Sequence, residues 1–545
     1  MTLEYGDFYN LQEEIKILRN RIHNLLSFVF APVLSGVLLV LAFPSHNVGW
    51  LGWVALVPLM VTLSSKSPGQ GFRLSYLFGF VFFPGVFYWI LQVSGYTYLH
   101  HLILAVYLSL YFGFWGLVFA FFVKNRGIIT ALLIAPFVWV ILEFIRSNFS
   151  FLALPWALLA HTQYQYPPII QIASITGAYG ISFLIVLINS AFSAIILFLI
   201  RTYKGDPSPS YLLISGRGVM LIVSAAALSF AIVLSYGFKI VAGPIVYDSI
   251  KVSVVQGNID QDKKWDLKYR ELIMQTYDEL TRMASQDRPE LIVWPETATP
   301  SAINRDQRLY DQVKFISQSA GTNLLLGSAQ HQKFTQGDDK RINYMNSAFL
   351  ISPDNKPKSQ RYDKIRLLPF GEYLPMERTI PWSFLGIPQL QSYTPGNEFT
   401  VFEVLPIRFS ATICWENIFP NLVRQFVKKG ALFIVNITNE AWFGKTSAPY
   451  HFVAMSVFRA VENRVSVVRC ANTGVSCFIN PNGKIISKVN HENQDIFITG
   501  YLTKKIPLAK EKTFYTDYGD VFAYLNNITI IIMVFLTVMK SRKNR

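Results

Sequence analysis

Residues 407 to 417 have the sequence Ile407-Arg408-Phe409-Ser410-Ala411-Thr412-Ile413-Cys414-Trp415-Glu416-Asn417. An apolar, β-prone run ends there at a cysteine. This predicts a strand that delivers a thiol to its tip, where a loop or helix begins. A thiol at such an edge can reach a substrate, and its thiolate is a strong nucleophile. A buried, inert cysteine is the competing interpretation, because free cysteines are among the most buried residues.

Two further segments set charged residues in comparable positions. The first is a short strand that ends in a carboxylate, Leu291-Ile292-Val293-Trp294-Pro295-Glu296-Thr297. The second carries a lysine and then a glutamate after a Pro-Phe-Gly turn, Arg361-Tyr362-Asp363-Lys364-Ile365-Arg366-Leu367-Leu368-Pro369-Phe370-Gly371-Glu372-Tyr373. Together the three segments hold an acid–base group, a cation and a nucleophile.

The composition indicates a membrane protein with a large water-soluble insert. Hydrophobic residues make up 52% of the 545 residues, charged residues 15%, and the mean hydropathy is +0.32. The apolar excess lies in about the first 245 residues and the last 25 or so, as in a polytopic membrane protein. The net charge of +15 is explained by cytoplasmic loops near anionic headgroups rather than by nucleic acid. Three cysteines are too few for a disulfide framework, and Cys470 and Cys477 are interpreted as structural.

Eight apolar segments are predicted to span the membrane, since about 20 residues cross a hydrocarbon core. They lie at about 28–45, 49–65, 74–96, 102–124, 128–146, 178–200, 218–241 and 520–540. The first two are short and joined tightly, so they are also compatible with a hairpin. Residues 1–27 carry apolar side chains at helical spacing and are interpreted as a cytoplasmic amphipathic leader.

Loop charges predict the orientation, because cytoplasmic loops are enriched in lysine and arginine. Basic residues occur in the leader, in alternate loops and in the tail: Lys16, Arg19, Arg21, Lys66, Arg73, Lys124, Arg126, Arg201, Lys204, Arg217, Lys540, Arg542, Lys543 and Arg545. The intervening loops nearly lack them. Both termini are therefore expected in the cytoplasm. The expected domains are a leader (1–27), seven spans (28–245), a periplasmic domain (246–518), and an eighth span with the tail (519–545).

The loop after the fifth predicted span is long and aromatic, with Phe149, Phe151, Trp156 and Tyr164. It can be an interfacial aromatic belt or a wall that guides a lipid toward the thiol. The insert alternates strands and helices, which indicates an α/β sandwich. Strands are predicted near 250–258, 291–294, 323–327, 399–413, 432–436, 465–471 and 475–479, with a hairpin-like region near 343–352. Helices are predicted near 268–286, 305–319, 419–429 and 447–463.

The Glu296, Lys364 and Cys414 segments, in this order and setting, resemble the nitrilase superfamily triad. Mounted on these spans, they resemble the apolipoprotein N-acyltransferases of the bacterial envelope. The most specific pieces are residues 364–375, Cys414-Trp415-Glu416 and Thr438-Asn439-Glu440-Ala441-Trp442-Phe443-Gly444, where the family often has Asp in place of Glu440. The resemblance implies a four-layer αββα fold. It also implies acyl transfer from a phospholipid to the α-amine of a lipoprotein's N-terminal diacylglyceryl-cysteine, in the bacterial inner membrane.

Acyl transfer through a thioester gives each residue an expected role. Cys414 is the nucleophile, Glu296 handles the protons, and Lys364 stabilises the oxyanion and lowers the thiol pKa. By resemblance, Glu372 is a second active-site carboxylate and Glu416 a positioning residue. Four aromatic residues are expected to shape the pocket, the substrate entrance or the acyl channel: Trp265, Trp415, Tyr373 and Trp442.

The sequence predicts no metal and no cofactor, since no HExxH, paired CxxC, Walker or dinucleotide motif occurs. A Gly-x-Ser-x-Gly elbow is also absent, which argues against a serine lipase. By resemblance, the expected partners are phosphatidylethanolamine as donor and a diacylated apolipoprotein as acceptor, with the protein working as a monomer. The alternatives are a membrane-anchored amidase or nitrilase, and a transporter with an inactive domain. Transport paths use buried charges, and the predicted spans contain few of them. Glu143 and Arg146 are the exceptions.

Overall fold

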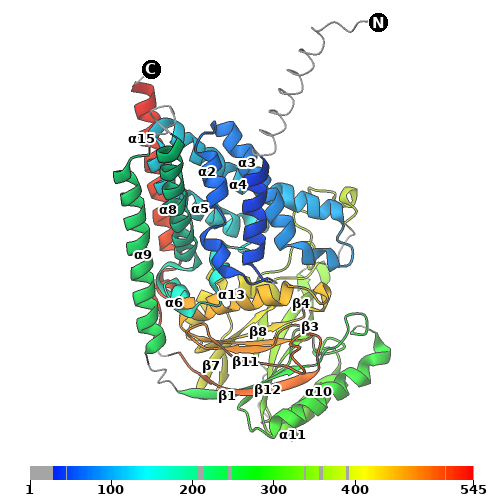
Figure 1. Cartoon of the computed structure of the whole chain (residues 1–545). Helices are drawn as coiled ribbons and strands as arrows, with labels where there is room; N and C mark the ends of the chain where they lie inside the picture. Colours follow the sequence, from blue (N-terminus) through cyan, green and yellow to red (C-terminus); the bar gives the residue numbers. More distant parts are fainter. Residues whose placement is uncertain are drawn as a thin grey trace, which may run out of the picture.

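The computed structural model describes residues 29–44, 46–204, 214–243, 248–264, 266–336, 339–354, 360–387, 392–509 and 511–543. A bundle of long helices lies on one side and an α/β sandwich on the other (Figure 1). The predicted leader and Trp265 lie outside the described residues.

The helical part contains five helices long and apolar enough to cross a membrane among the described residues. They are α4 (Tyr98–Arg126), α5 (Ile128–Asn148), α8 (Ala178–Lys204), α9 (Gly216–Ala242) and α15 (Val521–Lys543). The other apolar helical stretches are shorter or less apolar: Val29–Ala42, η1 with α2 (Gly49–Trp53, Val57–Leu63) and α3 (Pro68–Val86). The predicted number of about eight spans therefore stays a prediction.

Capping residues explain where the third predicted span differs from the sequence prediction. Helix α3 begins at Pro68 because Ser67 and Gln70 form a capping box. It ends at Val86, two residues after Pro84, and a 3-10 helix, η2 (Tyr88–Gln92), follows. The predicted segment 74–96 is therefore placed about six residues too late at its start and about ten too late at its end.

The sandwich consists of two six-stranded sheets. The first has the order β12-β1-β2-β3-β4-β5 and the second β11-β10-β9-β8-β7-β6. Within them, β1, β2 and β3 run parallel, as do β7, β8 and β9. The strands are β1 (Ser249–Gln256), β2 (Leu291–Val293), β3 (Asn323–Gln336), β4 (Asp339–Ile351), β5 (Gln360–Asp363), β6 (Phe402–Val404), β7 (Ile407–Ile413), β8 (Phe433–Thr438), β9 (Ser466–Ala471), β10 (Cys477–Ile479), β11 (Ile485–Lys488) and β12 (Gly500–Pro507).

The two sheets face each other, and helices cover both outer faces. Helices α10 (Arg270–Ser285) and α11 (Gln307–Ala320) pack on the first sheet, and α12 (Pro420–Lys428) and α13 (Ala448–Asn463) on the second. Side chains alternate along a strand: Leu291 and Val293 face the core between the sheets, while Ile292 faces α10 and α11. The predicted αββα sandwich is confirmed.

Helix α13 lies between the second sheet and the helical bundle (Figure 1). It is buried along nearly its whole length. The aromatic loop after α5 packs against it: the Trp156 ring lies 4.7 Å from Phe452, and the His161 ring 5.2 Å from Phe458. Since Trp156 and residues 158–163 are buried, this part of the loop docks the sandwich on the bundle. It is neither an exposed aromatic belt nor an open wall.

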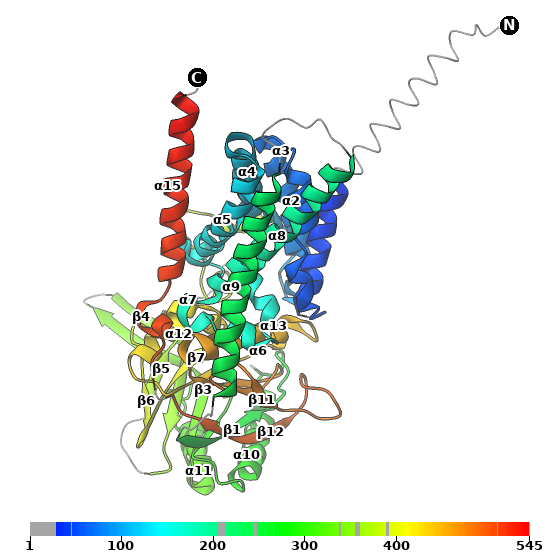
Figure 2. The ribbon, with the colours of Figure 1, turned by 60° about the vertical axis from the view of Figure 1, so that its left-hand side comes forward.

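The basic loops and the sandwich lie at opposite ends of the bundle. Arg126, at the end of α4, donates hydrogen bonds to Leu536 O and Thr537 Oγ1 near the end of α15. At the other end, His100 bonds to the carbonyl of Leu385 at 2.8 Å, and Trp89 packs 5.0 Å from Phe443. The last turns of α15 point away from the sandwich (Figure 2). This separation agrees with the alternation of loop charge along the sequence.

Candidate active site

The three predicted reactive residues follow strand ends. Cys414 comes directly after β7, Lys364 directly after β5, and Glu296 three residues after the end of β2. Cys414 has φ +56°, a left-handed conformation that is uncommon for a residue with a side chain and that accumulates at functional sites. The structure brings these three residues together between the two sheets.

Lys364 is held by two carboxylates and by its backbone. Its Nζ lies 2.8 Å from Glu372 Oε1 and 3.8 Å from Glu296 Oε1, and the side chain is 2% exposed. Its amide donates to Asn346 O and its carbonyl accepts from Gly396 N. Burial lowers the pKa of Lys364, but Glu372, Cys414 and Glu296 outweigh it and raise the pKa overall. The amine is therefore a permanent cation in the working range of pH.

Glu296 is oriented by hydrogen bonds to both carboxylate oxygens. Asn346 Nδ2 donates to Oε1 at 2.8 Å, and the Asn439 amide donates to Oε2 at 2.8 Å. Asn346 also donates to Glu372 Oε1 at 3.1 Å, so one amide joins the two carboxylates that flank the lysine. Glu296 as a whole residue is only 6% exposed, which suits a group that exchanges protons with a buried reaction centre.

Cys414 is half-buried and faces both charges. Burial raises the pKa of its thiol, Glu296 adds to this rise, and Lys364 opposes it. Lys364 acts in the expected direction and lowers the thiol pKa, but the net shift is upward. Desolvation and the glutamate outweigh the ammonium. The resting sulfur is a thiol, and Glu296 has to take its proton as the sulfur attacks.

Glu416 connects the thiol loop to the lysine loop. Its Oε1 accepts hydrogen bonds from the Tyr362 hydroxyl and from the amides of Ile365 and Arg366, all within 2.9 Å. Its Oε2 accepts from the Ile413 amide. Burial raises the pKa of Glu416 to about 7. Its hydrogen bonds thus join the backbone before Cys414 to the backbone after Lys364, and its role as a positioning residue stays a prediction.

The predicted aromatic residues lie in different surroundings. Trp415 is buried, donates to Arg366 O at 2.7 Å and packs on Phe419. Tyr373 is half-buried after the Pro-Phe-Gly turn. Trp442 is 47% exposed beside Phe443, whose ring meets the helical part. Their part in a pocket or an acyl channel stays a prediction.

A row of polar residues crosses the second sheet beneath the thiol. Thr412 pairs with Asn436, and Asn436 with Arg469, on three parallel strands. Asn436 Nδ2 donates to the Cys414 carbonyl at 3.2 Å, and Asn436 Oδ1 accepts from Arg469 at 2.7 Å. Arg469 also pairs with Glu440, and both are fully buried. This row fixes the backbone at the cysteine.

Sequence reasoning missed several residues of the site, among them Asn346, Asn439, Arg469 and Lys264. Asn346 and Arg469 lie within strands, where nothing local marks them. Asn439 lies in the segment 438–444, but the prediction for that segment concerned Glu440 and Trp442 and not Asn439. Lys264 directly precedes Trp265, which is a predicted site residue. This neighbourhood in the sequence could have indicated that Lys264 also belongs to the site. Its Nζ donates to the backbone carbonyl of Glu296 at 2.9 Å.

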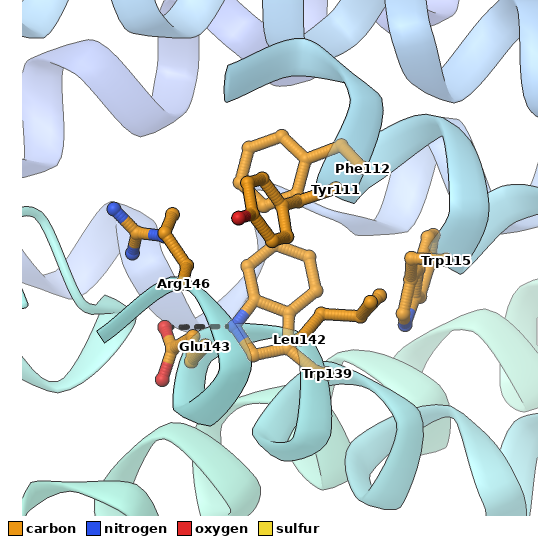
Figure 3. A pocket seen from close by; sticks show the side chains of 7 residues that line it. All are labelled: Tyr111, Phe112, Trp115, Trp139, Leu142, Glu143 and Arg146. Atoms are coloured by element: carbon orange, nitrogen blue, oxygen red, sulfur yellow. Dashed lines mark hydrogen bonds between the residues drawn. The ribbon is translucent and has the colours of Figure 1, made fainter. Parts of the chain in front are cut away.

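A separate small pocket lies among the membrane helices, between α4 and α5 (Figure 3). Glu143, one of the residues that line it, accepts hydrogen bonds from Trp139 Nε1 and the Leu159 amide. Arg146 donates to the carbonyls of Trp156 and Ala157. These two charges therefore hold the loop that docks the sandwich, which removes the feature that favoured a transporter.

Solved structures of similar domains cover about half of the chain. A mutant of the Nesterenkonia AN1 amidase from the nitrilase superfamily is 16% identical, with a TM-score of 0.35, and covers 47% of this chain and 90% of its own. Saccharomyces cerevisiae Nit3, of the same superfamily, is 17% identical, with a TM-score of 0.36, and covers 49% and 92%.

Sequence comparisons cover nearly the whole chain. Residues 35–191 match the apolipoprotein N-acyltransferase N-terminal domain, and residues 251–509 match the carbon-nitrogen hydrolase family. The apolipoprotein N-acyltransferase of Chlorobaculum tepidum is 31% identical and covers 91% of this chain and 94% of its own. That of Geobacter metallireducens is 38% identical over 502 residues, which are 90% of this chain and 92% of that protein. On this similarity, the chain belongs to the apolipoprotein N-acyltransferase family.

Proposed function

We propose that this protein transfers a fatty acyl chain from a phospholipid to the α-amine of the N-terminal diacylglyceryl-cysteine of an apolipoprotein, the last step of bacterial lipoprotein maturation. The observation that carries the proposal is the buried Glu296–Lys364–Cys414 cluster, in a sandwich that packs directly on membrane helices. A thiol suits the reaction, because a thioester forms readily and stays reactive toward amines.

In the first half-reaction, Glu296 takes the proton of the Cys414 thiol as Sγ attacks the ester carbonyl carbon of the phospholipid. The ammonium of Lys364 stabilises the oxyanion that forms. When the tetrahedral intermediate collapses, the carbon–oxygen ester bond breaks and the proton on Glu296 passes to the leaving alcohol. A lysophospholipid departs, and Cys414 holds the acyl chain as a thioester.

In the second half-reaction, the α-amine of the acceptor attacks the thioester carbon and Glu296 accepts the amine proton. The carbon–sulfur bond breaks, an amide forms, and the proton returns to the sulfur. The same carboxylate serves twice, so its geometry matters in both halves. Asn346 and Asn439 hold Glu296, and Glu372 holds Lys364, each at 2.8 Å.

We also propose a membrane division with seven spans in 28–245, a periplasmic catalytic domain in 246–518 and a last span with the tail in 519–545. The basic loops at the end away from the sandwich support a cytoplasmic placement of that end and of both termini. The bacterial inner membrane is the proposed location. We further propose phosphatidylethanolamine as the preferred donor and a monomer as the working unit.

The test is a transfer assay with the purified, detergent-solubilised protein. Phosphatidylethanolamine with a labelled acyl chain is mixed with a synthetic diacylglyceryl-cysteine peptide, and the label on the peptide is measured by mass spectrometry. We expect label on the α-amine, none on a peptide whose amine is acetylated, and less when phosphatidylglycerol is the donor. Release of free fatty acid without labelled peptide would contradict the proposal and favour a hydrolase.

A further inference from the structure

A short segment between β1 and α10 is fixed over the candidate active site by hydrogen bonds. The Asn258 amide donates to the Asn472 carbonyl, and the Ile259 amide to the Asn472 side chain, each at 2.9 Å. Gln261 Oε1 accepts from Asn439 Nδ2 at 2.7 Å, and the amide of Asn439 in turn holds Glu296. The segment is therefore anchored to the loops after β8 and β9.

This segment delivers a second lysine to the site. Lys264 is 2% exposed, and its Nζ donates to the carbonyl of Glu296 at 2.9 Å. An ammonium has three N–H donors, and in the described part of the chain this is the hydrogen bond found for Lys264, with no carboxylate oxygen within 4.0 Å of it. The next residue back, Lys263, is exposed and pairs with Asp260 at 2.7 Å.

The charges that reach Lys264 come from the reaction centre. They are Glu296, after β2, and Cys414, after β7, and both favour the protonated amine. On its own segment, Asp260 is already paired with Lys263 at the surface. Burial outweighs the two active-site groups and lowers the pKa of Lys264 to about 7, so its charge can change in the range where an enzyme works.

We propose that Lys264 is a second cation of the active site, whose protonated form stabilises the anionic sulfur of Cys414 and the oxyanion that follows. It acts through its charge and not by touching the reacting atoms, and Lys364 remains the permanent cation. The part of this inference that concerns acyl transfer rests on the proposed function, whereas the effect on the sulfur does not.

The test is the rate at which iodoacetamide alkylates Cys414 between pH 6 and 9, followed by peptide mass mapping. Below pH 7 the protonated Lys264 favours the thiolate, so Lys264→Met should slow alkylation about tenfold, the effect of one pKa unit. Near pH 9 the amine is neutral, and the two rates should converge. The wild-type profile itself should flatten in the region where a proton shifts between the two groups.

Two variants separate charge from other effects. Lys263→Met removes the exposed neighbour and should follow the wild-type profile. Lys264→Gln keeps a donor for the Glu296 carbonyl without the charge, so it should behave like Lys264→Met. A Lys264→Gln profile equal to that of the wild type would overturn the proposal. A ratio of wild-type to Lys264→Met alkylation rates that does not change with pH would also overturn it. So would a wild-type profile that never flattens, and that observation requires no variant.

Acyl transfer is then measured with labelled phospholipid in a single turnover. Lys264→Met should slow adduct formation about tenfold at pH 6.5 while KM for the lipid stays within about twofold. If the alkylation rate depends on Lys264 as predicted but neither the wild type nor any variant transfers an acyl chain, the proposed function is wrong. The role of Lys264 as a second cation is then still supported. If Lys264→Met leaves the alkylation rate unchanged while acyl transfer is normal, the proposed role of Lys264 is wrong and the proposed function is not affected.

Discussion

Glu416 shows how one residue can matter at this site without reacting. Its two oxygens accept hydrogen bonds from the strand that carries Cys414 and from the loop that carries Lys364. The carboxylate therefore sets the distance between nucleophile and cation. Because all its partners are donors, an amide in its place would turn one NH₂ group toward a donor.

Glu416→Gln should leave a buried donor unsatisfied and lower the free energy of unfolding by about 1–3 kcal/mol. We expect acyl-adduct formation to fall at least tenfold, because misplacement of reactive groups is costly. Glu403→Gln is the matched control, since Glu403 is half exposed and pairs with Arg408 at the surface. Equal adduct formation in both variants, measured by intact-protein mass spectrometry, would contradict the positioning role.

At this scale the sequence identified the residues that end strands, and missed those that reach the site from elsewhere. Glu296 and Cys414 stand where an apolar run stops, whereas Lys364 follows the polar stretch 360–363 and was recognised by the motif that leads to Glu372. Asn346 and Lys264 have no such local signal. Their partners are 50 and 32 residues away, and only the folded sheet brings them close.

Among the elements, β7, β8 and β9 carry the row Thr412, Asn436 and Arg469 below the thiol. Because the strands are parallel and in register, one side chain from each strand meets its neighbour. The row ends in the buried pair of Arg469 with Glu440. Burial raises the pKa of Glu440 to about 7, so the arginine is what favours its charged form.

Arg469→Met should break this pair and leave an uncompensated buried carboxylate, at a cost of about 3–5 kcal/mol in unfolding free energy. The double variant with Glu440→Gln should recover part of the loss, because the two residues interact directly. Arg408→Met, which removes an exposed partner of Glu403, should change stability by less than about 1 kcal/mol. Thermal unfolding in detergent measures all three, and purely additive losses would contradict the pairing.

The elements that sequence analysis missed are those without a clear pattern. No strand was predicted after residue 479, yet β11 and β12 form edges of the two sheets. β12 carries Lys504 and Lys505 and pairs with β1 on one side only, so its sequence lacks the apolar run of a central strand. The hairpin-like region predicted near 343–352 is wrong, because it is a single strand, β4, which forms one long hairpin with β3. For the same reason β3 extends beyond its predicted end at residue 327.

For the whole molecule, the sandwich and the basic loops lie at opposite ends of the helical bundle (Figures 1 and 2). The alternation of loop charge predicted this separation. The number of spans was harder to predict, because the stretches Val29–Ala42 and Gly49–Leu63 are apolar but short. Both pack inside the helical part, and burial in a bundle gives the same apolar signal as a span.

Single cysteines test which end faces which compartment. Lys124→Cys lies exposed at the basic end and Glu492→Cys exposed on the sandwich. In intact cells, a membrane-impermeant maleimide should label Glu492→Cys and leave Lys124→Cys unlabelled until the inner membrane is opened. The parent protein, with Cys470 and Cys477 buried, gives the background. The reverse labelling pattern would contradict a periplasmic catalytic domain.

The most direct test of the account is to trap the acyl chain on the enzyme. The purified protein is incubated with labelled phospholipid without acceptor, quenched in acid and mapped by mass spectrometry. We expect a hydroxylamine-sensitive adduct on Cys414 that disappears in Cys414→Ala, forms much more slowly in Glu296→Gln, and persists in Cys470→Ala and Cys477→Ala. Label that survives Cys414→Ala, or that lies on a serine or on Cys470, would contradict it.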